Sequence, residues 1–142
     1  SIIRISALAA AALLALGGCS SDSVGPADGP LTGDWTYEVL DVLPPGNSTQ
    51  CSYTDIGIHL EQRGSQLSGF TAGGFARCSR GEEEFPAVPL QAVSISGVVN
   101  GTAVSFLIGD FILNDGTLDG EEISGSARFA ADAEGFFTMR RR

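Results

Sequence analysis

From Leu31 to its end, the chain alternates apolar and polar residues in short runs, which glycine-containing turns interrupt roughly every 8–12 residues. This alternation is typical of antiparallel strands that bury one face, and no stretch repeats its apolar residues with a helical period. We therefore expect an all-β domain, an antiparallel up-and-down meander of about eight strands that closes into a barrel and so removes free edges. A flattened sandwich is the alternative. The expected strands lie near residues 33–40, 54–62, 66–76, 92–99, 102–108, 111–118, 121–129 and 135–141.

The first hairpin is registered by its turn at Gly64-Ser65, a candidate type II′ turn. Pairing outward from this turn places Cys51 directly opposite Cys78, where two Cβ atoms lie close to bridging distance. A bulge at Gly73-Gly74 would shift the pairing by one residue. The chain has three cysteines, and this pairing leaves Cys19 alone. We predict a Cys51–Cys78 disulfide, the form that an even pair takes in an oxidising compartment.

Two further hairpins are expected at Asn100-Gly101 and Asp119-Gly120, dipeptides that favour tight turns between strands. The strand pairing counted from each of the three turns shows which apolar residues and glycines share the inward-facing side of the strands. Because the glycines leave room, the interior is either filled by side chains or able to hold one small ligand. The candidate lining residues are Ile58, Leu60, Leu67, Gly69, Ile95, Gly97, Val104, Phe106, Ile123, Gly125 and Phe129.

The N-terminal segment differs from the rest of the chain. Arg4 precedes an apolar run from Ile5 to Leu16 that is broken only by Ser6. About 12 apolar residues suit the core of a signal peptide and are too few for a membrane-spanning helix, which needs about 20. We expect a helical signal peptide over residues 1–18, a flexible tether of serine, glycine, aspartate and proline over residues 19–30, and the barrel over residues 31–142.

Leu16-Gly17-Gly18-Cys19 resembles the lipobox of bacterial lipoproteins. The resemblance implies that the Cys19 thiol receives a diacylglyceryl group and becomes the new N-terminus, so that acyl chains anchor the protein in the bacterial cell envelope. Ser20 after the cysteine is similar to residues that favour outer-membrane sorting in enteric bacteria. An ordinary secretory signal that ends near a cysteine is the alternative.

Charge and residue types narrow the range of functions. The net charge is −9 at pH 7 and no lysine occurs, so we expect no nucleic-acid partner. The protein is also expected to be a monomer. The single histidine, His59, alternates with apolar neighbours and is expected on the outer face rather than as a catalytic base. One histidine and two paired cysteines cannot hold zinc, and the acidic residues at 82–84 and 115–122 match no calcium loop. We expect no enzymatic activity, no metal and no cofactor.

Leu31-Thr32-Gly33-Asp34-Trp35-Thr36 resembles the first strand of avidin-type barrels, in which Leu-Thr-Gly-x-Trp opens the sheet. The series of hairpins with short turns, and the last strand with Phe137-Thr138-Met139-Arg140, are similar to those of the wider calycin-like group. This group includes lipocalins and small periplasmic inhibitors of metalloproteases. The resemblance implies a small barrel that Trp35 plugs at one end. Avidins surround biotin with several tryptophans and place an asparagine two residues beyond the first one. Here Trp35 is the only tryptophan and Tyr37 holds the second position, so biotin is not the expected ligand.

These features predict a non-enzymatic, lipid-anchored envelope protein whose small β-barrel is a binding or interaction module. Two alternatives stay open: a lipocalin-like carrier of a small apolar molecule, and a barrel that blocks a protease with the segment before Leu31. The expected partners are the membrane, through the acyl chains, and either a protein or a small apolar ligand.

Overall fold

A computed structural model describes residues 29–44, 46 and 48–142, together with all of their side chains except that of residue 131. The expected signal peptide, Cys19 and nearly all of the expected tether lie outside these residues. Within the described part, no helix is long and apolar enough to cross a membrane.

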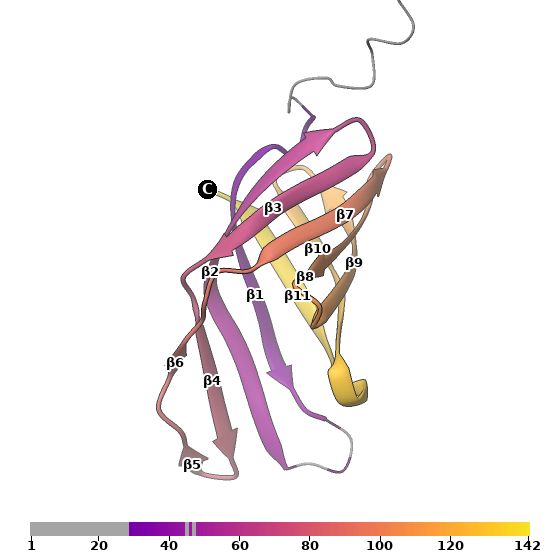
Figure 1. The fold of residues 1–142 in the computed structure, drawn as a ribbon. Helices are drawn as coiled ribbons and strands as arrows, with labels where there is room; N and C mark the ends of the chain where they lie inside the picture. Colours follow the sequence, from indigo (N-terminus) through magenta and orange to yellow (C-terminus); the bar gives the residue numbers. More distant parts are fainter. Residues whose placement is uncertain (1–28, 45, 47) are drawn as a thin grey trace, which may run out of the picture.

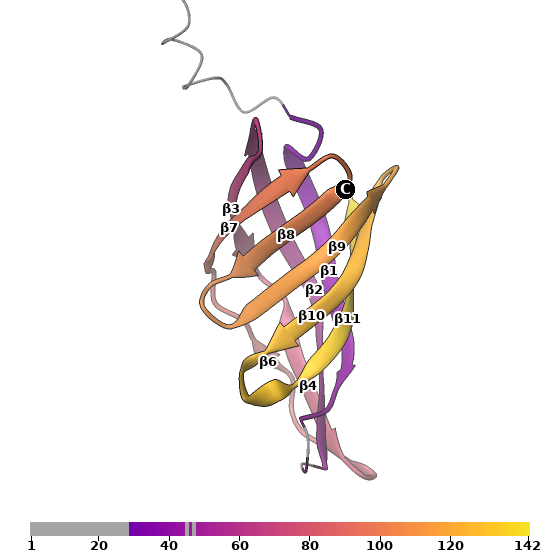
Figure 2. The ribbon, with the colours of Figure 1, turned by 90° about the vertical axis from the view of Figure 1, so that its right-hand side faces the viewer.

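Eight antiparallel strands form a closed barrel, in which each strand pairs with the barrel strand before it and β1 pairs with both β2 and β11 (Figures 1 and 2). The expected all-β class and barrel are therefore confirmed, and the sandwich alternative is wrong. The barrel strands are β1 (Gly33–Val42), β2 (Thr49–Arg63), β3 (Gln66–Ala72), β7 (Ser94–Asn100), β8 (Ala103–Ile108), β9 (Ile112–Asp119), β10 (Glu122–Phe129) and β11 (Glu134–Arg141). A single 3-10 turn, Ala130–Asp132, connects the last two.

Three more strands lie outside the barrel and form an arm, which we define as residues 75–90. They are β4 (Phe75–Arg80), β5 (Glu83–Glu84) and β6 (Val88–Pro89), and β4 pairs with the first half of the long β2 (Figure 1). The single strand expected over 66–76 is thus wrong, because the chain leaves the barrel at Gly73-Gly74. The connection over residues 79–90, which lies between two of the expected strands, carries the two short strands β5 and β6.

The disulfide between Cys51 and Cys78 is confirmed, with an S–S distance of 2.10 Å. The two cysteines are direct partners in the β2–β4 register, and the β2–β3 register is continuous with it. The break at Gly73-Gly74 therefore inserts no extra residue, and the pairing counted from the Gly64 turn extends along the whole of β2.

The turns of two hairpins are displaced by one residue from the expected positions. Asn100 pairs with Ala103, and Asp119 pairs with Glu122, so the two-residue loops begin at Gly101 and Gly120. Only the glycine has a positive φ in each loop, 62° and 63°, which is the pattern of a type II′ turn rather than type I′. Moving the loop by one residue shifts the pairing by two, so every side chain keeps its expected face.

The inward-facing glycines bring neighbouring strands together instead of leaving space. A Cβ atom at Gly69 would lie 1.9 Å from the carbonyl oxygen of His59, and one at Gly125 would lie 2.0 Å from that of Asp115. At Gly97 the corresponding contact is 2.3 Å, to the carbonyl oxygen of Ser105. Since no real Cβ atom tolerates such distances, these positions require glycine for the strands to bend around a narrow interior.

The interior of the barrel is packed with apolar side chains from all eight strands. The largest ones that are fully buried are Trp35, Tyr37, Phe106, Phe137, Leu31, Ile58, Leu60, Ile123, Met139, Val39 and Val104. Phe137 is buried while its neighbour Phe136 is 81% exposed, which decides which of the two faces inward.

Replacing Gly125 by alanine tests this close approach. We expect Gly125→Ala to lower the free energy of unfolding by about 2–4 kcal/mol, because the added methyl group meets the backbone of β9 rather than a movable side chain. Ser124→Ala, on the exposed side of the same strand, serves as the control and should change stability by less than about 0.5 kcal/mol. Urea unfolding of both variants provides the measurement, and equal stabilities would contradict the close packing of β9 and β10.

Candidate binding site at the barrel mouth

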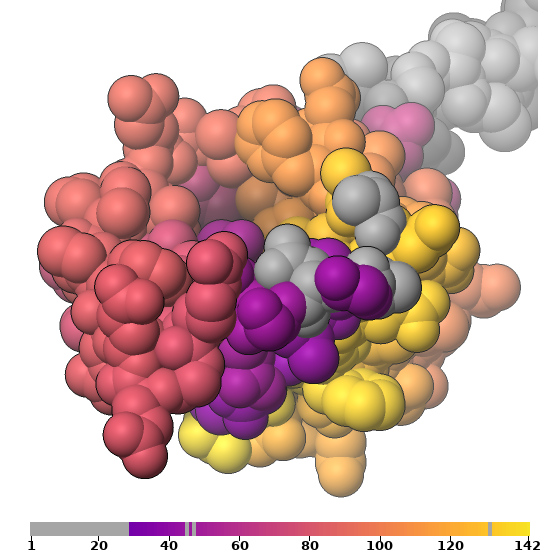
Figure 3. All heavy atoms as spheres, turned by 90° about the horizontal axis from the view of Figure 1, so that it is seen from below, coloured from indigo at the N-terminus to yellow at the C-terminus, as the bar shows by residue number. Residues whose placement is uncertain are grey.

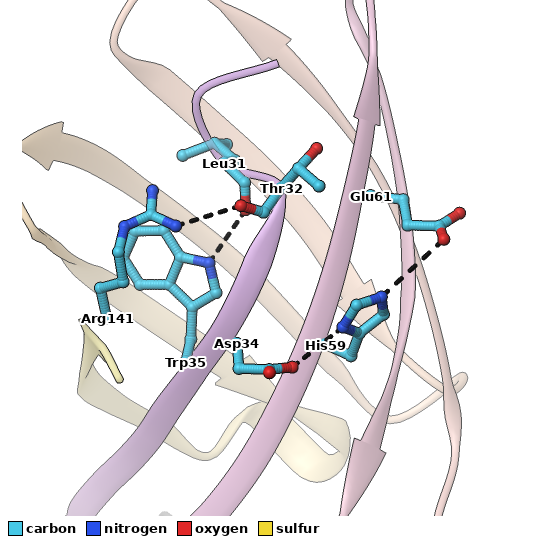
Figure 4. Close-up of polar contacts among 7 residues, drawn as sticks. All are labelled: Leu31, Thr32, Asp34, Trp35, His59, Glu61 and Arg141. Atoms are coloured by element: carbon cyan, nitrogen blue, oxygen red, sulfur yellow. Dashed lines mark hydrogen bonds and ion pairs between the residues drawn. The ribbon is translucent and has the colours of Figure 1, made fainter. Parts of the chain in front are cut away.

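One end of the barrel is closed by the residues that lead into β1. Trp35 is fully buried and its Nε1 donates a hydrogen bond of 2.9 Å to the carbonyl oxygen of Leu31. The guanidinium of Arg141 lies 4.3 Å from the centre of the Trp35 ring and donates a hydrogen bond of 3.1 Å to the carbonyl oxygen of Thr32 (Figure 4). It also donates to the carbonyl oxygen of Pro30. Leu31, also fully buried, packs into the same core. The structure thus places Trp35 beneath a hydrogen-bonded seal that joins the first and last strands.

Gln62 ties the same seal to the second strand. Its Oε1 accepts a hydrogen bond of 3.1 Å from the backbone N–H of Leu31, and its Nε2 donates one of 3.0 Å to the carbonyl oxygen of Gly64. Its own backbone N–H donates to Oγ1 of Thr32 at 3.0 Å. Both side-chain groups of this buried amide are therefore satisfied, which removes the cost of burying it.

The middle of the barrel contains a second buried polar contact. The hydroxyl of Tyr37 donates a hydrogen bond of 2.7 Å to Oδ1 of Asn114, and both residues are fully buried. Nδ2 of Asn114 donates to the carbonyl oxygens of Phe106 and Ile112, at 3.4 and 3.3 Å. Burial raises the pKa of the Tyr37 phenol well above its usual range. The position that the avidin resemblance associates with a ligand is thus occupied by an internal hydrogen bond.

The opposite end of the barrel is open and contains an apolar cavity of about 350 Å³. Seen from this end, the surface is hollowed beside the arm (Figure 3). The cavity draws its walls from β2, β3, β8–β10 and the segment that returns from the arm. Its lining residues are Tyr53, Ile56, Thr71, Gly73, Leu90, Gln91, Val93, Ile108, Phe111, Ile112 and Phe129. We call this end the mouth.

A second cavity of about 310 Å³ shares the aromatic residues Tyr53, Phe111 and Phe129 with the first. It continues toward the disulfide, and its other lining residues are Val42, Pro44, Thr49, Cys51, Ala130 and Ala133. No charged side chain lines either cavity. The mouth therefore offers two neighbouring, uncharged cavities of about 350 and 310 Å³.

Three aromatic rings dominate the mouth. Tyr53 stacks on Phe129 with their ring centres 5.3 Å apart, and Phe111 is 58% exposed at the rim. The Tyr53 phenol makes no hydrogen bond with the described residues, and partial burial raises its pKa. An aromatic wall with one free hydroxyl suits a neutral, apolar molecule that carries a single hydrogen-bonding group.

Among the interior candidates chosen from the sequence, Phe129 lines both cavities. The others line neither cavity, and those with apolar side chains are at most 3% exposed in the packed core. The sequence reasoning missed Tyr53, Leu90 and Phe111, which lie beside a bulge in β2, at the end of the arm and in a loop. Large apolar residues at or near the ends of the strands expected from the sequence were the signal that could have identified them.

His59 lies on the outer face of β2, with 35% of its side chain exposed. Its Nδ1 is 2.9 Å from a carboxylate oxygen of Asp34, and its Nε2 is 3.8 Å from one of Glu61 (Figure 4). Each ring nitrogen thus faces a carboxylate rather than a nucleophile. In the residues that the structure covers, no group of three or more histidine, cysteine, aspartate or glutamate side chains is arranged to hold a metal ion.

The buried phenol of Tyr37 makes stability depend on pH. Because its pKa in the folded state is raised, the neutral phenol stabilises the fold below pH 10, and this contribution is lost as the pH rises above the unfolded-state pKa of about 10. We expect Tyr37 to lower the free energy of unfolding by about 1 kcal/mol between pH 10 and 11, with a slope that approaches about 1.4 kcal/mol per pH unit above this range. Tyr37→Phe should remove that part of the slope, as measured by urea unfolding across this pH range. Identical slopes in both proteins would contradict the assignment, and Tyr53→Phe is the matched control at a less buried phenol.

Comparisons of this chain with protein-family models, with curated proteins and with solved structures found no match. Its function is therefore inferred from its own sequence and geometry.

Proposed function

We propose that this protein is a lipid-anchored binding module of the bacterial cell envelope, and that the barrel mouth takes up a small, neutral, apolar molecule. The observation that carries the proposal is the uncharged cavity of about 350 Å³ with its adjoining space. Binding sites for small molecules are concave, mostly apolar and typically about 300–1,000 Å³ in volume. For the mouth we therefore prefer the alternative of a lipocalin-like carrier of a small apolar molecule over that of a protein-binding module.

The chemistry of the mouth limits the ligand class. The aromatic rings favour flat or chain-like apolar groups, and the free hydroxyl of Tyr53 can donate to or accept from one polar group. A carboxylate or phosphate would enter a site without a cation, on a protein with a net charge of −9. An alcohol, ketone or ester with an apolar body is the class that fits both constraints.

The absence of catalytic groups at the mouth supports a binding role rather than an enzymatic one. Its lining contains no acid, base or thiol, since the one cysteine beside it is held in the disulfide. The inhibitor alternative is less well supported, because the described residues just before Leu31 are bonded into the closed end of the barrel.

The mouth can be tested with a matched pair of valine variants in the barrel, residues 29–142. Val93 lines the cavity, whereas Val98 is 57% exposed on β7 and lines neither cavity. With 1-decanol as a neutral probe, we expect Val93→Trp to weaken binding at least about tenfold, because the indole fills the cavity, and Val98→Trp to stay within about twofold. Isothermal titration gives the affinities, and thermal unfolding shows whether both variants fold.

Two results would contradict the mouth as the site: no binding of 1-decanol by the unmodified barrel, or equal binding by the two valine variants. A native mass spectrum of protein isolated from its source provides an independent check. A small-molecule adduct that is lost on denaturation supports a carrier, and its mass identifies the ligand class.

The anchoring part of the proposal rests on the resemblance of Leu16-Gly17-Gly18-Cys19 to a lipobox. Mass spectrometry of the protein from bacterial membranes should find an N-terminal peptide that begins at Cys19 and carries a diacylglyceryl group and acyl chains. Cys19→Ser should abolish both the modification and the cleavage, while Cys51 and Cys78 serve as internal controls that carry no lipid. An unmodified Cys19 in the wild-type protein would exclude the anchor.

A further inference from the structure

The outer surface of the barrel contains a groove of about 560 Å³ that runs over β1, β10 and β11. We call it the acidic groove and define it by Glu38, Leu40, Asp41, Glu134 and Phe136. It lies on the outer side of strands whose alternate residues fill the barrel core, so it is separate from the mouth and shares no lining residue with it.

Two exposed apolar side chains form the floor of the acidic groove. Phe136 is 81% exposed, the highest value among the large exposed apolar residues of the described part, and Leu40 is 47% exposed. The two residues are direct partners in the β1–β11 register and therefore lie side by side. Together they form a small contiguous apolar patch within the groove, which a partner molecule can cover.

Three carboxylates border this apolar pair, and none of them has an ionic partner. Glu38, Asp41 and Glu134 make no ion pair with any described residue, whereas Glu61, Glu121 and Glu122 each do so elsewhere on the barrel. Arg128 is the register partner of Glu134 on β10 but is not within ion-pair distance of it. The border of the groove is therefore negative and not neutralised from within the chain.

A bulge in β1 brings the third carboxylate into the groove. Leu40 and Asp41 are consecutive, yet both line the groove, although neighbouring residues of a regular strand face opposite sides. The register between β1 and β2 shifts at this point, and Asp41 has a φ of 58°, a conformation that is uncommon for residues other than glycine. The bulge thus holds Asp41 in an unfavourable backbone conformation, and this conformation places an unpaired carboxylate beside exposed apolar groups.

We infer that the acidic groove is a docking surface for a basic segment of a partner polypeptide. Lysine or arginine side chains of the partner would pair with Glu38, Asp41 and Glu134, while an apolar side chain between them would cover Phe136 and Leu40. A guanidinium or ammonium group over the Phe136 ring would add a cation–π contact. Since β1 is paired on both sides, the partner binds through side chains and not by adding a strand.

A charge-matched pair of triple variants tests this inference in the whole chain, held in neutral-detergent micelles. The probe is a labelled peptide that alternates lysine with leucine, and its binding is followed by fluorescence anisotropy against protein-free micelles. We expect Glu38→Gln/Asp41→Asn/Glu134→Gln to weaken binding about tenfold. Glu82→Gln/Glu83→Gln/Glu84→Gln removes the same charge from the exposed arm and should leave binding within about twofold.

The apolar half of the surface is tested separately with Phe136→Ser. This variant should weaken the lysine–leucine peptide but not change the weak binding of a peptide in which serine replaces leucine. Equal loss in the two triple variants would overturn the inference, because net charge alone would then explain the attraction. No binding by the wild-type chain would overturn it as well. Dimerisation that depends on Phe136, seen by analytical ultracentrifugation, would assign the groove to a second copy instead.

Discussion

The pairing of β1 with β2 on one side and with β11 on the other closes the sheet, and the rest of the molecule is arranged around this closure. The interior of an eight-stranded barrel is narrow enough for side chains to fill it almost completely. Space for a ligand therefore exists only where the inward-facing side chains do not fill the interior. Glycines at Gly69, Gly97 and Gly125 let the strands approach one another closely, and the core above the mouth is consequently solid. The cavity remains only where β2 bulges and the arm departs from the barrel.

The period-two pattern of the sequence was sufficient for the fold because each strand buries one face. The turn after β7 begins at Gly101 and not at the predicted Asn100, which changes the pairing partners of β7 but not the face of any residue. The predicted core residues are therefore correct although the predicted turn is not. The Cys51–Cys78 pair followed from the same counting, since the break at Gly73-Gly74 added no residue to the register.

The site was less predictable, because it depends on departures from regular strands. Asp41 and Asp55 adopt positive φ values where the β1–β2 register shifts. The alternation of apolar and polar residues does not predict such bulges. Gln62 and Asn114 are buried although amides are usually exposed, and only their hydrogen-bond partners explain why. Tyr53, Phe111 and Leu90 line the mouth from a strand, a loop and the end of the arm, which are adjacent only after the barrel has closed.

The closed end also determines how the barrel is presented to its surroundings. The described chain enters at Gly29 (Figure 1), whose backbone N–H donates a hydrogen bond to the carbonyl oxygen of Gln62 at the sealed end. The residues that line the mouth lie at the other end of the barrel. The chain therefore joins the barrel at the end remote from the mouth. An anchor in the sequence before Gly29, as proposed above, would leave the entrance of the cavity clear of the connecting chain, and a ligand would reach the cavity without passing the segment that leads into β1.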